Sequence, residues 1–103
     1  MSEDALNRAT RINQLLTKWQ KRVSGESSIN PLRVVELLGA NPFITTNGVA
    51  DKLGIAFTTA QRSIERLKRA SIVKQVGDAK RDRVYCATAL LDILEEPARL
   101  RTT

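Results

Sequence analysis

Four polar side chains near residue 60 have the types that read DNA bases: Thr58, Thr59, Gln61 and Arg62. They fall within one short stretch, so a helix through it would carry them on its first two turns. In the major groove Gln pairs with adenine, Arg pairs with guanine, and Thr contacts a polar base edge or a thymine methyl. These four residues are therefore the predicted base contacts, with a solvated helix face as the alternative.

Basic side chains follow and are predicted to contact the DNA backbone: Arg66, Lys68, Lys74, Lys80, Arg81 and Arg83. The first two would lie further along the same helix, and the rest would line a β-hairpin that follows the backbone or enters the minor groove. A bare solvated hairpin is the alternative. We expect Arg62→Ala to relax sequence preference. Lys80→Ala should weaken binding to all DNA sequences alike, because each neutralised phosphate adds about 0.9 to the slope of log affinity against log salt.

Phe57 stands immediately before the polar stretch and is unusual at an exposed helix start. Two interpretations stay open: contact with a thymine methyl, or cover for an edge of the core.

Composition limits the remaining chemistry. The 103-residue chain has no His and one Cys, so His-based catalysis, Cys and His zinc sites and an internal disulfide are excluded. We expect no enzyme activity, no cofactor and no metal, and we interpret Cys86 as a small core residue in a strand. The net charge is +6, and residues 56–87 hold eight Lys or Arg against three Asp or Glu. This concentration of charge favours an anionic partner.

The elements that would position these residues form a helix-turn-helix followed by a hairpin. We expect helices over 47–53, capped by Thr45 or Thr46, and over 57–69, separated by a left-handed Gly54. Strands are expected over 72–76 and 83–87, joined by a polar turn. Earlier in the chain we expect a helix from an N-cap Asn30 to Gly39 and a short strand at Phe43-Ile44, and after the hairpin a helix from a capping Thr88 to Leu94.

The first helix, over residues 5–23, repeats apolar residues as a heptad seam. The seam either packs on its own domain or pairs with a second copy or another domain. The residues predicted to dimerise the chain are Ala9, Ile12, Leu16 and Trp19.

The predicted fold is α+β and mostly helical: a winged helix-turn-helix with an added N-terminal amphipathic helix and a C-terminal helix. We expect the amphipathic helix and a linker over 1–28, the winged helix over 29–96 and a tail over 97–103. The chain has no apolar run of the roughly 20 residues that a membrane span needs. The N-terminus lacks the pattern of a secretory signal, so a cytoplasmic protein, nucleoid-associated when bound to DNA, is expected.

Residues 34–87 resemble the C-terminal winged-helix domain of Fic-family proteins (filamentation induced by cAMP). The matching segments are 35–38, 41–44, 50–55, 59–60, 64–67, 83–85 and 91–94. Such short motifs are also shared with MarR-like regulators. The resemblance implies an accessory domain that binds DNA, or that regulates and dimerises a Fic catalytic domain. The Fic reaction itself needs a His-containing motif that this chain lacks.

Double-stranded DNA is therefore the expected partner, for a transcriptional regulator or for the DNA-binding part of a Fic-type protein. The alternative is a protein-interaction or dimerisation module that does not bind DNA. A salt-sensitive DNA titration separates the two.

Overall fold

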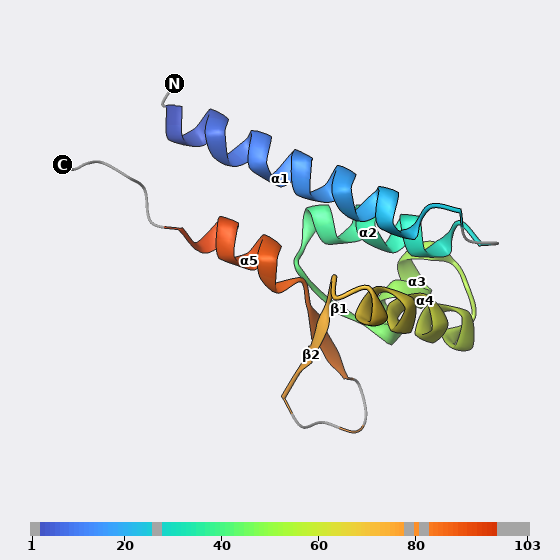
Figure 1. Cartoon of the computed structure of the whole chain (residues 1–103). Coiled ribbons are helices and arrows are strands. Elements are labelled where there is room, and N and C mark those ends of the chain that lie inside the picture. The colour runs from blue at the N-terminus through green and yellow to red at the C-terminus, as the bar shows by residue number, and fades with distance from the viewer. Residues whose placement is uncertain (1–2, 26–27, 78–79, 81–82, 97–103) are drawn as a thin grey trace.

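The computed structural model describes residues 3–25, 28–77, 80 and 83–96 (Figure 1). In this part of the chain the elements are α1 (Glu3–Val23), α2 (Asn30–Ala40), β1 (Phe43–Thr45), α3 (Thr46–Leu53), α4 (Phe57–Arg69), β2 (Lys74–Val76), β3 (Val84–Cys86) and α5 (Thr88–Glu95). The predicted class, α+β and mostly helical with an added helix at each end, is confirmed.

The three strands form one antiparallel sheet in the order β1-β3-β2. Cys86 on the central strand lies opposite Phe43 of β1 and opposite Lys74 of β2. The β2–β3 hairpin extends away from α1, while α1 runs beside α2 and α5 (Figure 1). The sheet therefore holds a projecting hairpin next to the helix-turn-helix.

The helix-turn-helix has the caps that its sequence predicts. The Thr45 side chain accepts a hydrogen bond from the Gly48 backbone N–H at 3.0 Å, which caps α3. Gly54 ends the helix at φ 66°, in the left-handed region that glycine enters without steric cost. The predicted bounds of the next helix, Phe57–Arg69, are those observed.

The end of α4 shows why the expected start of the following strand was too early. The Ile72 N–H bonds to the Leu67 carbonyl and the Ser71 N–H to the Lys68 carbonyl, while Ser71 has φ 62°. This pattern is a Schellman motif with serine in the left-handed position that glycine usually takes. Ile72 and Val73 belong to this turn and the core, so β2 begins at Lys74.

Three predicted helix signals were wrong in detail. Asn30 is the first residue of α2 and not its cap, since the cap position is Ile29. Gly39 does not stop this helix; a Cβ there would lie 3.2 Å from the Leu16 Cδ1 atom, so glycine allows the close approach of α1. Thr88 is likewise the first residue of α5, and Ala87 occupies the cap position.

The core joins α1 to the winged helix. Trp19 is 3% exposed and Val23 is fully buried, and both belong to the same apolar cluster as Leu38, Ile64 and Tyr85. Cys86 is buried as predicted, and burial, helped by the nearby Glu95 carboxylate, raises the pKa of its thiol. The thiol therefore stays protonated and inert at neutral pH.

A polar contact holds α1 to α5 further from the core. Arg11 makes a bidentate salt bridge with Glu96, with 2.9 Å between Nη1 and Oε1, and the Arg8 Nη2 donates to the Glu96 carbonyl at 2.8 Å. Within the described ranges, none of the helices has the length and apolar character required to span a bilayer.

Candidate nucleic-acid interface

The candidate interface is built on the inner face of α4. Ala60, Ile64 and Leu67 are fully buried, and they attach this helix to the core. Ala60 is small, which permits the close crossing of α3 and α4 that the sequence predicts. Ser63 is also buried, because its hydroxyl donates to the Thr59 carbonyl at 3.0 Å and is thereby satisfied. The opposite face of α4 is left for solvent or a partner.

The predicted base contacts on the first turns of α4 differ in their exposure. Thr58 and Arg62 are exposed, whereas Thr59 and Gln61 are half-buried. The cap residue Ala56 makes no side-chain hydrogen bond to the helix. The N-cap side chain therefore accepts no hydrogen bond from the first backbone N–H groups of α4, and helix N-termini attract phosphate oxygens.

Gln61 is held by two neighbours inside the helix-turn-helix. The hydroxyl of Thr46, a buried residue on α3, donates to the Gln61 Oε1 at 3.0 Å. The Gln61 Nε2 donates to the Glu65 Oε2 at 3.2 Å. Bidentate reading of adenine uses both ends of a Gln amide. In this arrangement Gln61 links α3 to α4, and base contact would require its amide to exchange partners.

Arg66 also has a partner within the chain. Its Nη2 donates to the Arg22 carbonyl at 3.3 Å, and the Arg22 Nη1 donates to the Ala70 carbonyl at 2.9 Å. These two bonds connect the last turn of α1 to the C-terminal end of α4. The position of α4 is thus tied directly to the N-terminal helix, which the sequence did not indicate.

The remaining predicted backbone contacts lie on the end of α4 and on the hairpin. Lys68, Lys74, Lys80 and Arg83 are all exposed. Arg81, the sixth predicted contact, lies outside the described residues. These four cations are exposed, so the end of α4 and the hairpin present positive charge to solvent.

A groove runs between α4 and the N-terminal end of α2. Ser28 and Pro31 form one side, and the α4 residues include Arg62, Arg66 and Arg69. Arg69 was missed by the sequence analysis, although its spacing of three from Arg66 and seven from Arg62 places it on the same helix face. The groove therefore gathers three guanidinium groups beside the exposed face of α4.

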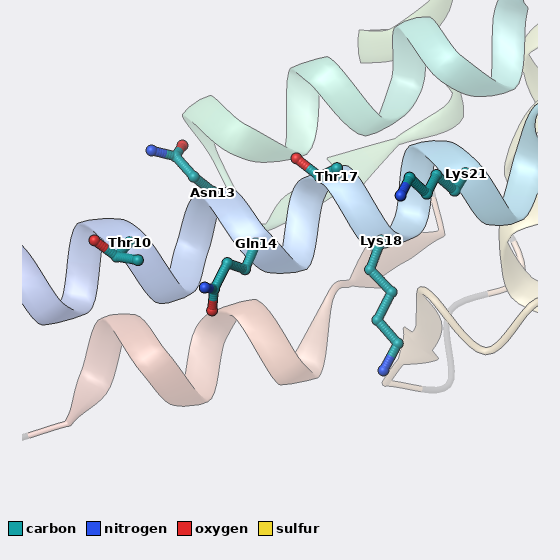
Figure 2. A pocket seen from close by; sticks show the side chains of 6 residues that line it. All are labelled: Thr10, Asn13, Gln14, Thr17, Lys18 and Lys21. Carbon is teal, nitrogen blue, oxygen red and sulfur yellow. The ribbon is translucent and has the colours of Figure 1, made fainter.

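A second hollow lies on α1, and its lining does not indicate a binding site. It is lined by Thr10, Asn13, Gln14, Thr17, Lys18 and Lys21. All six are exposed and all come from one helix. Figure 2 shows their side chains diverging along α1 instead of converging on one point. This surface is the solvated face of an amphipathic helix.

The residues predicted to dimerise the chain differ in burial along α1. Trp19 lies in the core of its own chain and cannot reach a partner in this fold, so packing within the domain is the correct interpretation for this residue. Ile12 and Leu16 are half-buried and also pack against that core. Ala9 is exposed, and dimerisation at the N-terminal half of α1 stays a prediction.

Residues 28–74 match the family model of winged helix-turn-helix DNA-binding domains. The chain has the fold of a winged helix-turn-helix. The match covers α2, α3 and α4 and ends where the hairpin begins. The model describes DNA binding and not catalysis, in agreement with the prediction that the chain is not an enzyme.

Two solved structures are similar to this winged helix. One is RV1404 from Mycobacterium tuberculosis, with a TM-score of 0.56 and 21% identity over 88% of this chain. The other is a MarR family protein from Bacillus stearothermophilus, with a TM-score of 0.47 and 18% identity over 88% of this chain. This chain spans 65% and 64% of their lengths. No curated protein matches it.

The expected membership of the Fic family is wrong. The family model that matches residues 28–74 is that of winged helix-turn-helix DNA-binding domains and not that of a Fic domain. The short motifs that suggested Fic proteins include core positions such as Leu38, Ile64 and Leu67. They follow from the packing of a winged helix, a fold that proteins of unrelated function share. A Fic catalytic domain is therefore not supported as a partner.

Proposed function

We propose that this chain is a transcriptional regulator that binds double-stranded DNA through α4 and the β2–β3 hairpin. The observation that carries the proposal is the two-sided character of α4. Its inner face is fixed in the core by Ala60, Ile64 and Leu67, and its outer face exposes Thr58 and Arg62. A rigid helix with a polar and basic outer face is what entry into the major groove requires.

The charges around α4 support the same assignment. Arg62, Arg66 and Arg69 line the groove beside the helix, and Lys74, Lys80 and Arg83 lie exposed along the hairpin. Basic residues at both places would neutralise phosphates on either side of a groove. Among the predicted base contacts, Arg62 has the most accessible position for reading guanine, while Gln61 would first have to release Thr46 and Glu65.

A homodimer through the projecting ends of α1 and α5 is part of the proposal. Ala9 is exposed on α1, and Leu94 is 44% exposed on α5 beside the Arg11–Glu96 bridge. Two copies joined there would present two α4 helices to successive major grooves. Sedimentation equilibrium over a range of concentrations tests the association, and Leu94→Glu should shift it toward the monomer.

Fluorescence anisotropy with genomic fragments and random duplexes at two salt concentrations tests DNA binding. We expect steep salt dependence and tighter binding to some fragments. Lys80→Ala should reduce the slope of log affinity against log salt by about 0.9. An absence of binding at low salt would reject the proposal and favour a protein-interaction module.

A further inference from the structure

Phe57 is the first residue of α4 and is 51% exposed. Its neighbours on the chain, Ala56 and Thr58, are exposed as well. Half of an aromatic side chain is thus left in water at the end of α4 that a winged helix directs into DNA. The remainder of the outer face is polar or charged.

Cover for a core edge accounts for only part of this side chain, since 51% of it stays exposed. The core is covered at the start of α4 by Ala60 and Ile64, which are fully buried, and Ile55 packs against it from the preceding turn. Phe57 lies three and seven residues before Ala60 and Ile64, so the inner edge of its ring borders the core face of α4. The exposed half of the ring gains nothing from this packing in the isolated chain.

We propose that Phe57 is a specificity-determining residue that packs against the C5-methyl group of a thymine in the major groove. This inference rests on the proposed DNA binding. The thymine methyl is the apolar feature that the major groove displays, and phenylalanine is one of the side chains that contacts it. Phe57 comes directly before Thr58 and five residues, about one and a half helical turns, before Arg62, so it would add a thymine at the end of the site that these residues read.

The test separates the methyl group from every other property of thymine. Bound duplexes are first selected from a random library with the unmodified chain. Each thymine of a selected site is then replaced singly by deoxyuridine, which keeps the base-pairing groups and lacks only the methyl. Affinities of the unmodified chain, Phe57→Ala, Phe57→Leu and Phe43→Ala are measured on every duplex.

At one thymine we expect the unmodified chain to lose affinity about fourfold on deoxyuridine, the equivalent of one buried methyl group. Phe57→Ala should lose a similar factor on the thymine duplex and show no further loss on deoxyuridine. Phe57→Leu should retain part of the discrimination. Phe43→Ala, which removes a ring of similar exposure on β1 and outside the predicted DNA contacts, should discriminate at that position as the unmodified chain does.

The inference is overturned if Phe57→Ala still discriminates at every thymine as strongly as the unmodified chain, or if the unmodified chain discriminates at none. Either result would leave DNA binding itself intact. If no duplex is selected at all, the proposed function and this inference both fail. Circular dichroism and thermal unfolding of Phe57→Ala confirm that the fold is retained, as expected for an exposed residue.

Discussion

Helices α1 and α4 have outer faces of similar composition in very different surroundings. The face of α1 carries Thr, Asn, Gln and Lys, and the face of α4 carries Thr, Gln, Arg and Lys. The side chains of the α1 face diverge to both sides of the helix (Figure 2). The α4 face begins at an exposed helix end, borders the arginine-lined groove at α2 and belongs to the same domain as the basic hairpin.

The comparison shows that a Thr/Gln/basic face is not by itself a recognition surface. Each helix alone satisfies the pattern, since any amphipathic helix has a polar side. Both helices pack an inner face on the core, so what distinguishes α4 is the setting of its outer face, beside the arginine-lined groove and in the same domain as the basic hairpin.

The largest expected effect concerns the inner face of α1. Trp19→Ala should lower the free energy of unfolding by about 3–5 kcal/mol, because a buried Trp leaves a large cavity. Urea unfolding at several protein concentrations measures it, and Lys18→Ala is the matched surface control. If the loss depended strongly on protein concentration, Trp19 would belong to an interface between copies.

The next effect tests the two outer faces directly. Arg62→Ala on α4 should cost about 1–3 kcal/mol on a selected site and relax the preference at one base pair. Lys18→Ala on α1 should leave affinity and preference unchanged. Anisotropy titrations with the selected site and its single-base variants measure both. Equal losses for the two substitutions would mean that the faces are not distinguished by their setting.

The link between α3 and α4 should have a smaller effect. Thr46→Val removes the hydroxyl that donates to Gln61 while keeping the volume of the buried side chain. We expect the free energy of unfolding to fall by about 1 kcal/mol, the net contribution of one such bond. The control is Thr46→Val made in a Gln61→Ala background, where the acceptor is absent and the substitution should cost less. Equal losses in the two backgrounds in urea unfolding would show that the hydrogen bond contributes nothing.

The smallest effect has the opposite sign and lies at the end of α4. Ser71 has φ 62°, so Ser71→Gly should raise the free energy of unfolding by about 0.5–1 kcal/mol through relief of backbone strain. The reciprocal Gly54→Ser should lower it by a similar amount, because an added Cβ at Gly54 meets no atom within 4 Å and the strain is conformational. Thermal unfolding of both variants measures the pair, and a destabilised Ser71→Gly would disprove the assignment of strain.

Much of the winged helix could be predicted because its signals are local. The apolar spacing of Ala60, Ile64 and Leu67 and the left-handed Gly54 determine the bounds of α4 and its turn. The same logic failed at Gly39, where the glycine serves a close approach to Leu16 on another helix. It also failed for the Fic family, since packing motifs identify a fold and not its function.

The candidate site was predictable in its residue types and less so in its roles. Thr58 and Arg62 are exposed where the helical period puts them. The partners of Gln61 and Arg66 were not predictable, because Thr46 and Arg22 lie 15 and 44 residues away in the sequence. Exposure of Phe57 likewise depends on how completely other residues cover the core.

The sequence alone determined the order of the elements, the caps that start α3 and the turn that ends it, the inner faces of the helices and the concentration of positive charge on α4 and the hairpin. These follow from side-chain periodicity, backbone preference and composition, which act over a few residues. Only the tertiary structure decided that Trp19 faces its own core, that Gln61 is held between α3 and α4, and that α1 is bonded to the end of α4. These contacts join residues distant in sequence, and they exist only once the core has brought the helices together.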